Sequence, residues 1–179
     1  LEFREATLSY KRNDICNVFA KYNKTVGYTL SKQKYQDLYD SIETHYPGVS
    51  RRPLGRFLLE LKEGDDPLFK KFLNDDGDSM YCEFELQDST IQQKKGIYLF
   101  SCGGDLKYIG KTTRSYKERI NSGYGRISPK NCYLDGQRTN CRLNALVATS
   151  SNVKFYVYPM VIDREIERTE KCLLLSYAP

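Results

Sequence analysis

Apolar residues recur every three or four positions in the first part of the chain. The clearest segments are 29–48 and 50–64, each with a serine near its start that can cap a helix and a glycine at its end. Weaker segments of the same kind are 65–73 and 9–23. These patterns predict that residues 1 to about 75 are helical, with Ser31 and Ser50 as the N-caps.

The pattern changes after a turn-rich break, NDDGD, at residues 74–78. A turn explains this break better than a calcium loop, because strand-like alternation follows it where an EF-hand requires a helix. Alternation at 80–86 predicts a strand, and two β-branched and aromatic runs around a CGGD turn predict a hairpin over 96–111. The remaining segments predict, in order, a helix, a helix, a strand and a helix: 112–123, 141–150, 154–162 and 163–177.

Together these patterns predict an α+β protein. A helical N-terminal region is expected over residues 1–90, serving in DNA recognition, in dimerisation or as a structural extension. A small three-stranded, mainly antiparallel sheet flanked by helices is expected over residues 91–179. A chain of 179 residues can bury about 70% of its unfolded surface, so it needs no covalent staple.

Cysteine and histidine usage argues against two classes of small protein. The six cysteines include no C-x-x-C pair and His45 is the single histidine, which argues against a structural zinc site. Without a recognisable signal peptide, the cysteines are expected to be reduced and the protein cytoplasmic, or nuclear in a eukaryote. No apolar run approaches the roughly 18 residues of a membrane span, so no membrane partner is expected.

Positive charge is concentrated rather than spread evenly. The chain has 28 Lys and Arg against 23 Asp and Glu, and residues 107–142 contain nine basic residues against Glu118 and Asp135. Tyrosines interleave with these cations, which suits a surface that meets phosphates and sugars, although a solvated charged face remains an alternative. The candidate nucleic-acid contacts are Arg114, Lys117, Arg126, Lys130 and Asn140, with Arg51, Arg52 and Arg56 from the N-terminal region.

Two tripeptides on the predicted hairpin carry a family resemblance. GIY at 96–98 and YIG at 108–110 resemble the signature of the GIY-YIG nuclease domain. Further residues follow in family order: an arginine on the next helix, a tyrosine after it, an asparagine-containing helix and a glutamate in the last helix. The resemblance covers about residues 95–177 and implies metal-dependent hydrolysis of DNA phosphodiester bonds.

The resemblance also implies roles for particular residues. Tyr98 corresponds to the general base or to the residue that orients water, with Tyr108 as its partner, and these roles could be reversed. Arg119 corresponds to the arginine that holds the scissile phosphate, and Tyr124 to a position occupied by His or Tyr. Lys111 corresponds to a basic or polar residue after the second glycine.

Glu170 corresponds to the metal-binding glutamate, and one carboxylate implies a single, largely hydrated Mg²⁺ or Mn²⁺. It lies between Ile166 and Leu174 on the helical stripe expected to be buried, where a carboxylate needs a partner. The sequence departs from family members that use histidines in this domain, because it has none there. It also lacks the asparagine that often follows the last helix.

Strand alternation explains why a hairpin suits such a site. Tyr98 and Tyr108 can reach one face of the sheet while Ile97 and Ile109 are buried on the other. An unperturbed tyrosine has a pKa near 10, so a catalytic one requires positive charge nearby to lower it, which Lys111 and Arg119 are expected to supply.

The expected function is therefore site-specific, restriction-like cleavage of double-stranded DNA, with a homodimer as one way to cut both strands. Homing, repair or RNA-processing nucleases of the same fold, and a binding module without catalysis, are the alternatives. Target sequence, cut position and oligomeric state have no signature in the sequence.

Overall fold

A computed structural model describes residues 1–177 and shows an α+β protein. The chain divides into two compact units, each assembled from separate segments. The sheet unit comprises Leu1–Asn13, Cys82–Arg126 and the described residues from Leu146 onward. The helical unit comprises Asp14–Tyr81 and Ile127–Ala145. The boundaries therefore differ from the expected division at residue 90, because N-terminal strands pair with partners distant in sequence.

The main sheet has four antiparallel strands in the order β1-β6-β4-β5, formed by Arg4–Ala6 (β1), Val153–Met160 (β6), Lys95–Cys102 (β4) and Asp105–Thr112 (β5). The prediction of three strands is thus incomplete, since β1 joins the edge of β6 with Arg4 opposite Val157. Three residues are too few to show alternation in the sequence.

A second sheet pairs β2 (Leu8–Ile15) with β3 (Tyr81–Leu86). The helix predicted over 9–23 is wrong: β2 is followed by a 3₁₀ helix at Val18–Lys21. Most of β2 is exposed on both faces, so no alternation of apolar and polar residues marks it as a strand. The strand predicted at 80–86 is confirmed.

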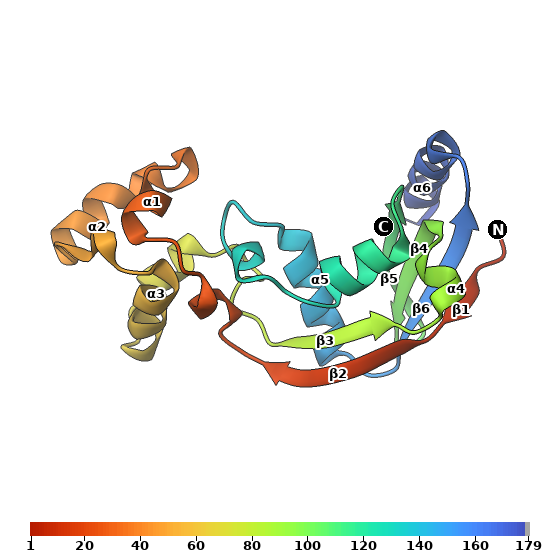
Figure 1. The fold of residues 1–179 in the computed structure, drawn as a ribbon, viewed down its shortest axis with the longest axis horizontal. Helices are drawn as coiled ribbons and strands as arrows, with labels where there is room; N and C mark the ends of the chain where they lie inside the picture. The colour runs from red at the N-terminus through yellow and green to blue at the C-terminus, as the bar shows by residue number, and fades with distance from the viewer. Residues whose placement is uncertain (178–179) are drawn as a thin grey trace. The chain divides into compact units, whose positions relative to one another are not determined.

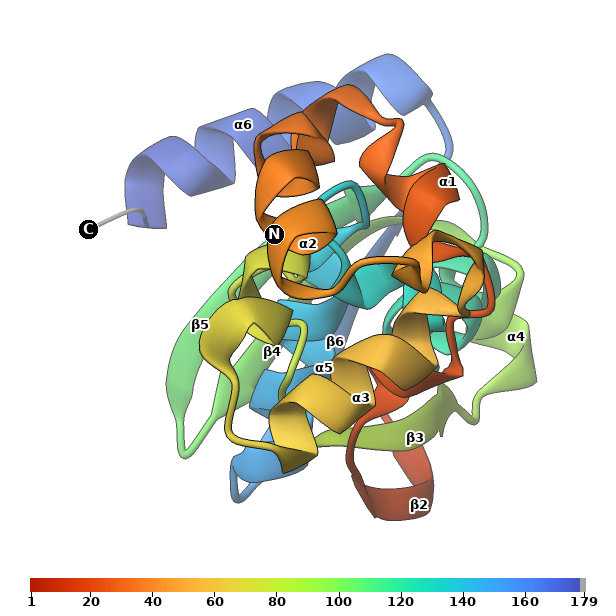
Figure 2. The ribbon, with the colours of Figure 1, turned by 90° about the vertical axis from the view of Figure 1, so that its left-hand side faces the viewer.

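Figure 2 shows the β4–β5 hairpin. The hairpin turns at Gly103 and Gly104, whose φ angles are +62° and +96°. Positive φ values explain the two glycines of the CGGD turn. A register shift between Phe100 and Ser101 interrupts the pairing near the turn. α4 (Ser89–Gln92) precedes the hairpin, and a helix at Lys117–Tyr124 follows it.

The closing helix α6 (Asp163–Tyr177) packs on one face of this sheet, against β4, β5 and β6 (Figure 1). Its Ile166 is buried with Ile97 and Ile109, and Leu173 packs against them. The prediction that Leu174 shares this buried face is wrong, because Leu174 is 42% exposed. Of the helices within residues 1–177, none is both long and apolar enough to cross a membrane.

The helical unit contains α1, α2 and α3, drawn in orange tones in Figure 2, and the N-terminal part of α5. Their bounds are Val26–Leu30, Tyr39–His45, Leu54–Glu63 and Arg138–Thr149, and the 3₁₀ segments of this unit are Val18–Lys21, Gln33–Leu38, Val49–Arg51, Pro67–Phe72 and Pro129–Cys132.

The helix predicted over 29–48 is broken into three pieces. Ser31 ends α1 rather than capping a new helix, because Lys32 adopts an extended conformation. Thr25 is the residue that caps α1, accepting a hydrogen bond from the Tyr28 amide. The helix predicted after Ser50 is shorter than expected: Ser50 lies in a 3₁₀ turn, and α3 begins after Pro53 and ends at Gly64.

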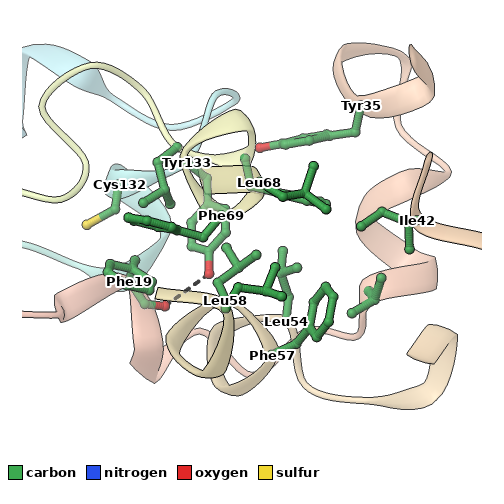
Figure 3. Close-up of a cluster of buried hydrophobic side chains, with 14 of the residues drawn as sticks. Phe19, Tyr35, Ile42, Leu54, Phe57, Leu58, Leu68, Phe69, Cys132 and Tyr133 are labelled. Carbon is green, nitrogen blue, oxygen red and sulfur yellow. Dashed lines mark hydrogen bonds between the residues drawn. The ribbon is translucent and has the colours of Figure 1, made fainter. Parts of the chain in front are cut away.

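Figure 3 shows the core of the helical unit, where leucine and aromatic side chains from several short segments converge. Phe19, Leu58 and Phe69 come from different elements and meet in one cluster. The buried Tyr133 hydroxyl donates to the Phe19 carbonyl at 3.0 Å, so a polar group in this core is satisfied. The unit is held by its core rather than by long helices.

Candidate active site

The hairpin brings Tyr98 and Tyr108 to one face of the sheet. Tyr98 is opposite Gly110 and Tyr108 is opposite Phe100, so the two tyrosines are diagonal neighbours. A Cβ atom at Gly110 would lie 2.6 Å from the Tyr98 Oη and 2.6 Å from the Tyr108 Cε1. The glycine of YIG therefore provides the space that the two rings occupy.

The helix predicted over 112–123 is a π-helix, and it begins later than expected, covering Lys117–Tyr124. Its i to i+5 pattern includes the 2.6 Å bond from the Gly125 amide to the Ile120 carbonyl. Residues five apart lie about one turn apart in such a helix, so Arg119 can cover Tyr124. The Arg119 guanidinium carbon lies 4.6 Å from the centre of the Tyr124 ring.

Hydrogen bonds join these four side chains into the tyrosine–arginine cluster. The Tyr124 hydroxyl is 2.8 Å from the Tyr98 hydroxyl and 3.4 Å from the Tyr108 hydroxyl. The Arg119 Nε donates to the Tyr98 Oη at 3.2 Å. Tyr98 and Tyr124 are fully buried, whereas Tyr108 and Arg119 are partly exposed. The partly exposed pair marks the side of the cluster that solvent reaches.

Burial dominates the electrostatics of this cluster. Burial raises the pKa of Tyr98 to about 12 with help from Tyr108, although the Tyr124 hydrogen bond and Arg119 act to lower it. Burial likewise raises the pKa of Tyr124. The expectation that positive charge would lower the pKa of Tyr98 is therefore wrong. Removal of solvent outweighs the nearby guanidinium.

Arg119 has no acidic partner in the part of the chain that the structure describes. Burial acts to lower the pKa of Arg119, but Tyr98, Tyr124 and Tyr108 raise it overall. The guanidinium thus keeps its charge while it faces hydroxyl groups rather than a carboxylate. A cation held in this way is prepared to receive an external anion.

Lys111 and Glu170 form a second, separate group. The Lys111 Nζ lies 3.1 Å from the Glu170 Oε2 of α6. Lys111 is opposite Ile97 and adjacent to Gly110, so strand alternation directs it to the face that α6 covers. Tyr98 and Tyr108 project from the other face. The predicted catalytic residues are consequently divided between the two faces of the sheet.

Glu170 is the only member of the predicted catalytic set that can ligate a metal through a carboxylate. Its side chain is 20% exposed, and its partner is Lys111. Residues 1–177 contain no group of three or more His, Cys, Asp or Glu side chains arranged around a common metal position. One carboxylate suits a largely hydrated Mg²⁺ that shares its remaining positions with water and a substrate phosphate. This donor set fits a single ion and not a two-metal site.

Several predicted nucleic-acid contacts are exposed. In the sheet unit, Lys117 and Arg126 are exposed, and Arg114 is exposed but pairs with Glu118 at 2.5 Å. In the helical unit, the exposed candidates are Arg51 and Arg56. These side chains are accessible, as contact with a phosphate requires.

Others are engaged within the helical unit. Arg52 contacts both carboxylate oxygens of Glu60 at 2.6 Å, and Lys130 pairs with Asp135. Asn140 is 4% exposed. Its side-chain amide donates to the Gln137 Oε1 at 2.9 Å, so Asn140 is engaged within the helical unit, and its assignment as a nucleic-acid contact stays a prediction. The helix that contains Asn140 turns this residue inward, and sequence alone did not show that direction.

Tyr116 supports the cluster and was not identified from the sequence. It is fully buried, and its hydroxyl lies 2.9 Å from the Ile97 carbonyl and 3.1 Å from the Tyr158 carbonyl. Its ring meets that of Tyr98 edge-on at 6.4 Å. A Cβ at Gly96 would lie 2.7 Å from the Tyr116 Oη, so the glycine of GIY admits this tyrosine. The glycine at position 96 was the one sequence feature that pointed to a side chain packed this closely.

The site therefore combines residues from β4, β5 and the π-helix on one face and an ion pair with α6 on the other. No protein-family model, curated protein or solved structure matches this chain. The resemblance to the GIY-YIG nuclease domain therefore stays a prediction from the sequence.

Proposed function

We propose that this protein is a metal-dependent endonuclease of the GIY-YIG type that hydrolyses DNA phosphodiester bonds. The observation that carries the proposal is the position of Arg119. Its guanidinium bonds to Tyr98, covers the ring of Tyr124 and has no carboxylate partner within residues 1–177. A cation aimed at the phosphoryl oxygens can stabilise the negative charge that develops in phosphodiester cleavage.

Arg119 is the residue that would bind the scissile phosphate. A guanidinium offers donors in a fork that matches two phosphate oxygens and cannot lose its charge at neutral pH. Its Nε is committed to the Tyr98 Oη, so the terminal nitrogens are the ones left to face the phosphate. This contact would stabilise the negative charge that develops during hydrolysis.

Tyr108 suits the role of the tyrosine that meets the attacking water better than Tyr98 does. Tyr98 is fully buried and its pKa is raised to about 12, so it holds its proton. Tyr108 is partly exposed and touches the same Tyr124 hydroxyl. We therefore place Tyr98 and Tyr124 as positioning residues for Arg119 and Tyr108. We therefore propose Tyr108, rather than Tyr98, for the role that the sequence leaves open between them.

Glu170 would hold a single Mg²⁺ or Mn²⁺, which when bound supplies positive charge for the phosphoryl oxygens and the leaving oxygen. Because Glu170 lies on the α6 side of the sheet and Arg119 on the other, the phosphodiester would have to reach both around β5, the edge strand of the sheet. The Lys111 Nζ pairs with this carboxylate at 3.1 Å.

We further propose that double-stranded DNA is the substrate and that cleavage is site-specific, as in a restriction system. One such site cuts one strand at a time, so cleavage of both strands would require a homodimer or two successive nicks. Homing, repair and RNA-processing roles use the same chemistry and are distinguished by the substrate that is cut.

Cleavage of supercoiled and linear duplex DNA, with Mg²⁺ or with EDTA, tests the proposal. Discrete fragments should form only with the metal, and Glu170→Ala should reduce the rate by about 10³-fold while DNA binding persists. Glu167→Ala is the matched control, because Glu167 is an exposed glutamate on the same helix. Full activity of Glu170→Ala would refute the metal assignment. Tight binding without cleavage of any DNA or RNA would instead indicate a binding module.

A second comparison tests the choice of tyrosine. Tyr108→Phe should slow single-turnover cleavage by about 10²-fold or more, which is typical for the loss of a group that handles a proton. Tyr98→Phe should cost less, because it removes only a positioning hydroxyl. Tyr158→Phe is the control, since this half-buried tyrosine packs on the α6 side. A larger loss for Tyr98→Phe than for Tyr108→Phe would reverse the assignment.

A further inference from the structure

Tyr28 of the helical unit is a large aromatic side chain left half exposed on a rigid support. It is 50% exposed, whereas its helix neighbours Val26 and Leu30 are buried. The Val26 amide donates to the Arg52 carbonyl at 3.0 Å, which fixes α1 against the chain before α3. The ring is thus presented to solvent from a backbone that cannot easily turn it inward.

Two lysines lie over this ring. The Lys32 Nζ is 4.7 Å and the Lys24 Nζ is 5.5 Å from the ring centre. They come from the two chain segments that flank α1, so the arrangement results from the fold and not from a run of adjacent lysines. A tyrosine between two ammonium groups combines an aromatic face with positive charge.

The positive charge continues from Lys32 toward a second segment of the same unit. Asp135 accepts a hydrogen bond from the Lys32 Nζ at 2.9 Å and also pairs with Lys130. The Lys34 Nζ donates to the carbonyl of the adjacent Leu134 at 3.2 Å. Burial lowers the pKa of Lys130, and the nearby charge of Lys32 lowers it further, although Asp135 opposes both. One carboxylate is therefore shared by two ammonium groups.

We define the Tyr28 patch as Lys24, Tyr28, Lys32, Lys34, Leu134 and Asp135, all of the helical unit. It carries three lysines and one aspartate, a formal charge of +2. Leu134 adds a second partly exposed apolar side chain at 36%. The patch is thus both basic and aromatic. Its single carboxylate, Asp135, leaves most of the lysine charge uncompensated.

We propose that the Tyr28 patch binds a single-stranded segment of nucleic acid, with the lysines on phosphates and a base against Tyr28. Lysine ammonium groups suit phosphates because they act as mobile point charges. A protruding tyrosine can stack on an unpaired base of any sequence, whereas a base within a duplex is covered by its neighbours. Lys24 and Lys32 exchange the ring for phosphates as the strand binds. The proposal concerns binding alone and does not depend on cleavage at the tyrosine–arginine cluster.

Fluorescence anisotropy of the full chain in EDTA tests this proposal, with a labelled 20-nucleotide DNA strand and the corresponding duplex as probes. Tyr28→Ala should weaken binding of the single strand by about 5- to 150-fold, the range for loss of one stacked base. Tyr28→Phe should restore most of the affinity. Tyr39→Ala is the matched control, because Tyr39 is 51% exposed in the same unit and no cation covers its ring within the described residues.

A charge variant provides an independent measurement. Lys24→Glu should weaken binding and should make the dependence of log affinity on log salt concentration shallower by about one unit. Lys71→Glu, an exposed lysine of the same unit outside the patch, should have a smaller effect. Far-UV circular dichroism of each variant should match that of the unaltered protein, since both altered side chains are exposed.

Three outcomes would overturn the proposal. The first is equal single-strand affinity for Tyr28→Ala and the unaltered chain. The second is a loss on duplex that equals the loss on the single strand, which would indicate backbone contact without stacking. The third is tighter, Tyr28-dependent binding of poly-glutamate, which would indicate an acidic polypeptide as the partner. Metal-dependent cleavage is measured separately. Cleavage together with single-strand binding that does not depend on Tyr28 would refute only this inference. Binding through Tyr28 without cleavage would refute only the proposed function.

Discussion

The sheet unit and the helical unit each place tyrosine hydroxyls beside positive charge, but they balance that charge differently. In the helical unit, the Tyr35 hydroxyl donates to Asp135 at 2.5 Å, and Lys32 and Lys130 pair with the same carboxylate. In the sheet unit, Arg119 meets only hydroxyl groups and aromatic rings within the described residues. One cluster contains its own anion and the other does not.

The difference separates a network whose carboxylate stabilises the fold from a candidate site for the scissile phosphate. Burial would raise the pKa of Asp135, but Lys130, Tyr35 and Lys32 together hold it well below its usual range. That carboxylate is ionised at neutral pH and its cations are partly compensated, so the network stabilises the fold. Arg119 has no such partner, and an incoming phosphate would supply the missing negative charge.

Arg119→Ala should have the largest effect among the variants that probe this comparison. Loss of the guanidinium should reduce single-turnover DNA cleavage by about 10³-fold, because the growing phosphoryl charge then lacks its main partner. Arg119→Lys should recover only part of the rate, since an ammonium lacks the fork. Arg126→Ala, which alters an exposed arginine of the same unit, is the control. Equal losses of cleavage rate for Arg119→Ala and Arg126→Ala would show that the tyrosine–arginine cluster has no specific role in cleavage.

High pH should destabilise the tyrosine–arginine cluster. The pKa of Tyr98 is raised to about 12, above its unfolded value near 10. The folded state therefore retains a proton that the unfolded state loses, and stability present below pH 10 declines as the pH rises toward 12. Two units of pKa correspond to about 2.7 kcal/mol.

Urea unfolding between pH 8 and pH 12 measures this decline. Tyr98→Phe should show a shallower loss than the unaltered chain, because it lacks the titrating hydroxyl. The Asp135 network should contribute nothing to that difference. Identical pH dependence for the two proteins would mean that Tyr98 does not hold its proton in the folded state.

The sequence identified the hairpin and the members of the cluster because local patterns encode them. GIY and YIG lie on strands whose alternation and turn are visible in 16 residues of sequence. The helix 163–177 was predicted with its observed bounds, since its periodicity is regular. The positions of Tyr98, Tyr108, Arg119 and Tyr124 in one cluster follow from those local elements together with the family resemblance.

Features that depend on distant partners or on burial were not predicted. β1 is a strand only because β6 pairs with it, and nothing in its three residues reveals that pairing. The inward direction of Asn140 and the exposure of Leu174 depend on what covers each helix face. The sign of the pKa shift of Tyr98 depends on desolvation, which is a property of the packed state and not of the residues nearby in sequence.

Asp135→Asn should reduce stability and leave cleavage unchanged, the opposite of the result expected for Arg119→Ala. The variant leaves Lys32 and Lys130 close together without their shared anion, so we expect a loss of about 2 kcal/mol in unfolding free energy at pH 7. Because the folded pKa of Asp135 is lowered, its contribution is present above the unfolded value near 3.9 and is lost as the pH falls below it.

Urea unfolding at pH 7 and at pH 3 checks both parts of this expectation. The difference between Asp135→Asn and the unaltered chain should shrink at pH 3. Asp37→Asn, which alters an exposed aspartate of the same unit, is the control. A constant difference at both pH values would show that the carboxylate charge of Asp135 does not stabilise the network.

Lys111→Ala should have the smallest effect on stability. It adds a third case to the comparison of the two units, in which one cation pairs with one carboxylate. The Lys111 and Glu170 side chains are 35% and 20% exposed, so solvent screens their attraction and the loss of stability should be about 0.5 kcal/mol. Lys107→Ala, which removes a more exposed ion pair with Asp105, should reduce the unfolding free energy by no more than that.

Lys111→Ala also leaves Glu170 without its ammonium partner, so we expect Mn²⁺ to bind at least as tightly as in the unaltered chain. Titration with Mn²⁺ monitored by electron paramagnetic resonance measures this affinity. Weaker Mn²⁺ binding would mean that Lys111 orients the carboxylate rather than competing for it, and the ion pair would then belong to the metal site itself.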